Sequence, residues 1–166
     1  MCHTTAEDTE MGATHTSAID VAKYLVLLAC SEDEPDCLTP MRAQKLLYYA
    51  QGWSLVHRKR PLFWEQIEAW AHGPIVPSVY QEFKDCGRSA IDPDRGSADN
   101  LTDEEREFVS EIWSTYRPYS AISLSDMTHE EPPWKDARGN IPREAPSSRE
   151  ITHQAMRDFF TSLLPK

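Results

Sequence analysis

The sequence predicts a mostly α-helical protein: a single compact domain of about six helices with a small β-hairpin or short strands. Three observations support this fold class. Apolar residues recur at helical spacing over most of the chain. Serine, threonine and proline stand where those apolar stripes begin, as they do at helix N-termini. One short run, Phe63 to Trp70, instead mixes aromatic and β-branched residues as strands do.

The N-terminal segment differs from the rest of the chain. Residues 1–16 are small, polar and acidic, which predicts a disordered tail before a domain over residues 17–166. Whether translation starts at Met1 or Met11 is left open. No signal peptide is recognisable, and the longest apolar run, Tyr24 to Cys30, is far shorter than the about 20 residues of a membrane span. A cytoplasmic protein is therefore expected.

Two helices are expected in the first third of the domain. Ser17 can cap a helix that runs to Cys30, before an acidic loop at Ser31–Asp36. Thr39-Pro40 opens a second helix, which Pro61 ends. The first apolar stripe is Ile19, Ala22, Val26 and Ala29, and the second is Leu46, Tyr49, Ala50 and Trp53. The second helix is apolar on more than one side, so it is expected to be central.

The middle of the chain combines strands with a short helix. Phe63–Trp70 predicts one or two short strands, whose pairing Gly73-Pro74 and Pro77 are expected to end. Pro77 then fits the first turn of a helix over Ser78–Cys86. A polar loop is expected over Arg88–Asn100.

Four further signals organise the C-terminal part. Thr102 and Glu105 form a capping box for a helix that Pro118 ends, and Ser120 opens a shorter helix to His129. Pro132-Pro133 is expected to break that helix and to begin a Pro-rich loop as far as Pro146. A last helix is expected from Ser148. Its predicted inner face carries Ile151, Ala155, Phe159 and Leu163.

Charge and cysteine content narrow the function classes. The formal net charge is −10, which disfavours nucleic acid and anionic membranes and would attract a basic partner. The triplet Arg58-Lys59-Arg60 is interpreted as a solvated helix end. Cys2, Cys30, Cys37 and Cys86 contain no C-x-x-C pair, so free thiols are expected, with a disulfide or metal pair as the alternative.

The sequence contains no strong catalytic motif. His129-Glu130-Glu131 is followed directly by Pro132, which breaks the helical spacing that a metal site would need. We therefore expect a capping or buried hydrogen-bonding role for Thr128 and His129. His72 is interpreted either as a general base or, preferably, as a strand-end residue that bonds backbone across a turn, because its neighbours supply no obvious nucleophile. No catalytic residue, metal or cofactor is expected.

Two long stretches resemble one known family. Residues 44–84 read QKLLYYAQGWSLVHRKRPLFWEQIEAWAHGPIVPSVYQEFK, and residues 101–138 read LTDEEREFVSEIWSTYRPYSAISLSDMTHEEPPWKDAR. Both are similar to the Panacea domain, which is found in SocA-like antitoxins of type II toxin–antitoxin systems and in phage-associated proteins. Ile141-Pro142 and the terminal helix fit as well, so the resemblance extends from Ala18 to Phe160.

The resemblance implies a cytoplasmic antitoxin without enzymatic activity that neutralises a cognate protein toxin by direct binding. It also implies an alternative, a proteolytic adaptor that delivers a toxin to a ClpXP-type protease. Some relatives carry an added DNA-binding domain, for which no segment is recognised here, and neither nucleic acid nor membrane is an expected partner. A third hypothesis, from another class, is a small hydrolase or transferase that uses His72 or His129. The oligomeric state is left open.

The positions that carry the resemblance are called here the motif residues, and they are also the candidates for a partner surface. They are Lys45, Tyr49, Gln51, Trp53, Trp70, His72, Gly73, Pro74, Pro77, Tyr80, Thr128, His129, Pro133 and Trp134. We interpret them mainly as a structural frame. Within it, His72-Gly73-Pro74 is expected to be a turn that supports a surface for the partner.

Overall fold

A computed structural model describes residues 16–31 and 38–166, so the predicted tail (apart from Thr16) and nearly all of the predicted acidic loop lie outside the described residues. Within these ranges the chain forms seven α-helices and a three-stranded sheet, which confirms the mostly α-helical prediction. The helices are α2 (Ala18–Cys30), α3 (Pro40–Trp53), α4 (Pro77–Phe83), α5 (Asp103–Tyr116), α6 (Ala121–Glu130), α7 (Pro132–Arg138) and α8 (His153–Ser162). The strands are β1 (Ile67–Trp70), β2 (Gly73–Ile75) and β3 (Glu150–Ile151).

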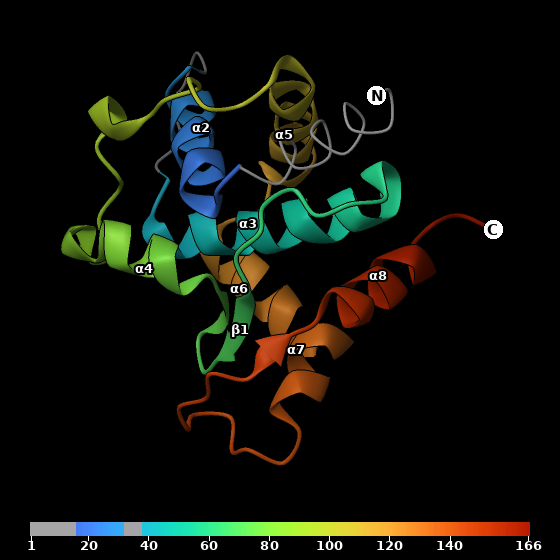
Figure 1. The fold of residues 1–166 in the computed structure, drawn as a ribbon. Helices are drawn as coiled ribbons and strands as arrows, with labels where there is room; N and C mark the ends of the chain where they lie inside the picture. The colour runs from blue at the N-terminus through green and yellow to red at the C-terminus, as the bar shows by residue number, and fades with distance from the viewer. Residues whose placement is uncertain (1–15, 32–37) are drawn as a thin grey trace, which may run out of the picture.

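Helix α3 is the centre of the fold, as its apolar composition predicts. It contacts α2, α4, α5, α6, α8 and β2. Figure 1 shows α3 crossing the middle of the molecule, with α2 and α5 above it and the sheet, α6, α7 and α8 below. The helix continues as a π-helical turn over Ser54–Arg58 and ends at Lys59, which has a left-handed φ of 64°.

The helix caps predicted at Ser17, Thr39 and Thr102 are confirmed. Ser17 and Thr102 each form a full capping box, and Thr39 accepts a hydrogen bond from the Arg42 amide. Thr16, the first described residue, is buried, and its hydroxyl donates to Glu105 at 2.6 Å. The caps therefore join α2 to α5 as well as starting them.

The prediction of a solvated Arg58-Lys59-Arg60 cluster is wrong for Arg58. Its side chain is only 8% exposed, and its guanidinium lies 2.8 Å from Glu104 on α5. Arg60 lies 3.3 Å from the same carboxylate. The end of α3 is thus fixed to α5 by an ion pair between residues 46 positions apart, which no local signal indicates.

The sheet has the order β2-β1-β3, with both pairs antiparallel. We expected Gly73-Pro74 to end the pairing, but both residues belong to β2, where Gly73 faces Trp70 and Pro74 faces Ala69. A proline is tolerated in an edge strand because its missing N–H need not be part of the ladder. Consistent with this, the amide of Ala69 bonds to the carbonyl of Arg149 on the β3 side.

The C-terminal third departs most from the sequence prediction. Pro132-Pro133 starts helix α7 and not a loop, because prolines fit the first helical turn, where amide groups have no intrahelical partner. The last helix begins after Thr152 and not at Ser148, because Ile151 pairs with Ile67 in the sheet. Consequently Met156 and Phe160 are buried, whereas Leu163 is 49% exposed.

Candidate functional site

Most of the motif residues, far apart in sequence, meet where the β1–β2 hairpin rests on α3, α6 and α7, whereas Trp53 lies apart and donates to the Tyr116 hydroxyl of α5. Most of them are buried: Lys45, Tyr49, Gln51, Gly73, Pro74, Thr128, His129, Pro133 and Trp134. Trp53, Trp70 and Pro77 are partly buried, and only His72 and Tyr80 are exposed. The set is therefore an internal frame with a small accessible part at the hairpin.

Gly73 lies directly over a buried amine. Its φ is +110°, and a Cβ at this position would lie 2.7 Å from Lys45 Nζ and 3.3 Å from Thr128 Oγ1. The Lys45 side chain is fully buried, and its Nζ is 3.4 Å from the carbonyl oxygen of Pro74. Burial lowers the pKa of Lys45 to about 7. Only glycine allows both this backbone angle and this close approach.

Helices α6 and α7 hold the turn of the hairpin by hydrogen bonds. His129 Nε2 lies 2.9 Å from the carbonyl oxygen of Ala71, and its Nδ1 lies 2.6 Å from that of Ser125. The indole of Trp134 donates to the carbonyl of Trp70 at 2.8 Å. The Thr128 hydroxyl donates to the Ser125 carbonyl at 2.8 Å. The hydrogen-bonding role expected for Thr128 and His129 is thus confirmed.

We expected His72 to bond the backbone across the turn, and this expectation is wrong. His72 is exposed, and its side chain forms no hydrogen bond within the described ranges. His129, from a helix 58 residues away, makes that contact instead. The turn proper is Ala71-His72, and Gly73-Pro74 already belong to β2.

Two buried glutamines of α3 bind the backbone just before and just after the β1–β2 hairpin. Gln51 accepts from the Leu62 amide at 2.8 Å and donates to the Phe63 carbonyl at 2.9 Å. Gln44 does the same to Val76, with distances of 2.8 Å to its nitrogen and 3.1 Å to its oxygen. Sequence reasoning named Gln51 but not Gln44. The two glutamines are seven residues apart, which is about two helical turns, so they lie on one face of α3. This spacing is the sequence signal that could have identified Gln44.

A half-buried carboxylate lies below the tyrosines of α3. The hydroxyls of Tyr48 and Tyr49 donate to Glu131 at 3.0 and 2.9 Å. Burial raises the pKa of Glu131 to about 7, although the two hydroxyl groups oppose that shift. Burial also raises the pKa of both tyrosines, so they act as donors. The sequence reasoning weighed Glu131 only as a metal ligand and missed this role.

Arg138 is a second residue that the sequence reasoning missed. Its guanidinium is buried and donates to four carbonyl oxygens, those of Ala69, Pro142, Arg143 and Ala145, at 2.6 to 3.0 Å. It also lies over the Trp134 ring, 5.0 Å from its centroid. Arg138 therefore fixes the loop between α7 and β3 against the central strand. The signal was lost because its helix was predicted to be a loop.

The accessible part of the frame is an aromatic surface beside a hollow. Trp70 and Tyr80 meet edge to face with centroids 5.2 Å apart, and Tyr80 is 43% exposed. Next to Trp70 is an open hollow of about 580 Å³. It is lined by Glu68, Trp70, Ala71, His72, Glu144, Pro146, Ser147 and Ser148.

Clusters of metal-binding side chains and membrane-spanning helices were both sought in the described ranges. Residues 16–31 and 38–166 contain no group of three His, Cys, Asp or Glu side chains that could hold a metal ion. None of the helices in the same ranges is long and apolar enough to cross a bilayer. Cys30 and Cys86, the two described cysteines, are free thiols.

Comparisons with known proteins agree with the resemblance. Residues 44–135 match the family model described as antitoxin SocA-like, Panacea domain. The chain is also 42% identical over 71 residues to "Antitoxin SocA" of Caulobacter vibrioides (strain NA1000 / CB15N). That alignment covers 43% of this chain and only 37% of the relative's length. No solved structure matches the chain.

Proposed function

Because the matched family model covers more than half of this chain, the chain belongs to the SocA-like antitoxins with a Panacea domain, and we propose that it neutralises a cognate protein toxin by binding it directly. The observation that carries the proposal is the family match, which includes every motif residue from Lys45 to Trp134. The similarity to a protein named antitoxin agrees with it. We propose residues 17–166 as the binding domain and the cytoplasm as its location.

The geometry favours binding over catalysis. The two ring nitrogens of His129 lie against carbonyl oxygens, and the amine of Lys45 is buried beneath Gly73. These groups hold the hairpin, and neither lines the hollow beside Trp70, although His129 borders a second hollow together with Lys135 and Arg143. The accessible motif residues are Trp70 and Tyr80, aromatic side chains of the kind that anchor protein interfaces, and His72, which lines the hollow without a hydrogen-bond partner among the described residues to orient it. We therefore propose a role without enzymatic activity.

Coexpression with the protein encoded directly beside this one tests the proposal. We expect the neighbour alone to arrest growth, and the pair to grow and to copurify as a stable complex. Failure of any adjoining gene product to bind or to be neutralised would refute the proposed function. Neutralisation that requires ClpXP, with loss of the toxin, would instead support the proteolytic adaptor.

A further inference from the structure

The hollow beside Trp70 has an apolar floor and an acidic rim. Trp70, Ala71 and Pro146 supply apolar surface, whereas Glu68 and Glu144 supply carboxylates. The indole of Trp70 donates to Glu68 Oε1 at 2.8 Å, which holds that carboxylate at the edge of the ring. A ligand that lies against the indole therefore meets a negative charge.

A further carboxylate lies on the same face of the sheet. Glu68 of β1 is directly opposite Glu150 of β3, so their side chains project from the same side. Like charges in this arrangement repel one another. Neither these two residues nor Glu144 forms an ion pair within the described ranges. Glu68 and Glu144 thus have no ion-pair partner in the described ranges, whereas Glu150 interacts electrostatically with His153.

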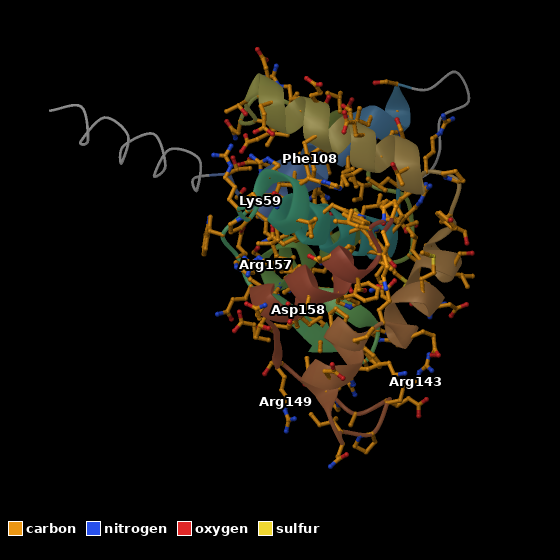
Figure 2. All side chains as sticks on the ribbon, turned by 90° about the vertical axis from the view of Figure 1, so that its right-hand side faces the viewer. Lys59, Phe108, Arg143, Arg149, Arg157 and Asp158 are labelled. Atoms are coloured by element: carbon orange, nitrogen blue, oxygen red, sulfur yellow. The ribbon has the colours of Figure 1, made fainter. Side chains whose placement is uncertain are left out.

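The arginines nearest in sequence to Glu144 and Glu150 are directed elsewhere, while His72 lines the hollow itself. The guanidinium of Arg149 lies 3.5 Å from the Arg138 carbonyl oxygen, and Arg143 lines a different hollow, together with His129 and Lys135. Figure 2 shows Arg143 and Arg149 on opposite sides of the lower part of the molecule.

We infer that this hollow binds a positively charged side chain, arginine or lysine, on a segment of the partner protein. The inference rests on the proposed function in that the partner is the toxin. The cation lies over Trp70, where the indole face attracts it, and between Glu68 and Glu144. The methylene groups of the arginine or lysine side chain cover the apolar floor at Ala71 and Pro146. The net charge of −10 steers such a segment toward the chain.

Other occupants fit the hollow less well. Nucleic acid and anionic lipid bring phosphates toward carboxylates, which repel them. A wholly apolar segment would remove water from Glu68 and Glu144 without pairing their charges, which is costly.

A titration of the isotope-labelled full chain with small peptides tests the chemistry. The probes are acetyl-Gly-Arg-Gly-amide and the same peptide with citrulline, a neutral molecule of nearly the same shape. We expect the arginine peptide to shift the indole N–H resonance of Trp70, and to bind at least about fivefold more tightly than the citrulline peptide. The double variant Glu68→Gln/Glu144→Gln should abolish that preference, whereas Glu107→Gln/Glu111→Gln, on exposed positions of α5, should retain it.

A second measurement uses the toxin itself. The protein from the adjoining gene should bind the Glu68→Lys/Glu144→Lys variant about tenfold or more weakly, while the melting temperature stays the same. If this protein is neutralised equally well by that variant, the docking inference is wrong although the proposed function stands. If no neighbour is neutralised but the arginine preference is found, the hollow binds a cationic side chain as inferred, whereas the proposed function is wrong. Equal binding of the arginine and citrulline peptides overturns the inference in either case.

Discussion

Replacement of Gly73 by alanine tests the packing at the centre of the frame. The φ of +110° is one that residues with a side chain rarely adopt, and holding alanine there costs about 1–3 kcal/mol. The added methyl would also lie 2.7 Å from Lys45 Nζ and 2.9 Å from its Cε. The end of a lysine is normally free to move, but this one is fully buried. Its displacement adds overpacking of about 1–3 kcal/mol.

The expected loss for Gly73→Ala is therefore about 2–6 kcal/mol in the free energy of unfolding. For a chain of this size, that corresponds to a fall in melting temperature on the order of 10 °C. Urea denaturation followed by circular dichroism measures the free energy, and a thermal scan measures the melting temperature.

Gly87→Ala is the matched control. Gly87 also has a positive φ, +59°, but a Cβ there would meet no atom within 4 Å. It should therefore show the backbone cost alone, about 1–2 kcal/mol. If Gly73→Ala destabilises the protein no more than Gly87→Ala does, then Lys45 does not constrain the hairpin and the reasoning is refuted.

Four other predictions follow from the site. Arg138→Lys should lower the free energy of unfolding by about 3 kcal/mol or more, because an ammonium cannot reach four carbonyl groups; wild-type stability in urea would contradict this. Burial raises the pKa of Glu131 from 4.5 to about 7, so its stabilisation is complete below pH 4.5 and is lost as pH rises through 7. Glu131→Gln should therefore flatten the stability profile between those values, and an unchanged slope would count against the burial argument. Burial lowers the pKa of Lys45 from 10.5 to about 7, so the unfolded state holds more protons than the folded state between pH 7 and 10.5, and the free energy of unfolding rises over that range. Lys45→Met should remove this rise, as measured by urea denaturation at a series of alkaline pH values. A rise that persists in the variant would show that another group is responsible. His72→Ala should change the free energy of unfolding by less than about 0.5 kcal/mol, and a larger loss would reveal a structural role for this exposed side chain.

Features that depend on neighbouring residues were predictable from the sequence. The capping boxes at Ser17 and Thr102 and the Thr39-Pro40 helix start each involve groups within three residues of one another. The central place of α3 followed from its apolar residues on several sides. The family was recognisable because its motifs are continuous runs of residues.

The C-terminal elements could not be predicted in this way. Two prolines in succession are compatible both with a helix break and with a first helical turn, and the structure selects the turn at Pro132. Strand β3 exists because Ile151 pairs with Ile67, 84 residues earlier in the chain (151 minus 67). A strand of two residues that pairs with so distant a segment has no recognisable pattern in the local sequence.

The helical class, most helix starts and the family follow from patterns among residues that are close in sequence. The contacts of the motif residues depend on how the chain folds: His129 and not His72 holds the turn, and Lys45 is buried beneath Gly73. Arg138, which no local pattern indicates, fixes the loop beside Trp70. The physical reason is the range of the interactions. Caps and apolar stripes form between residues a few positions apart, whereas burial and hydrogen bonds at the hairpin join helices that meet only after the chain has folded.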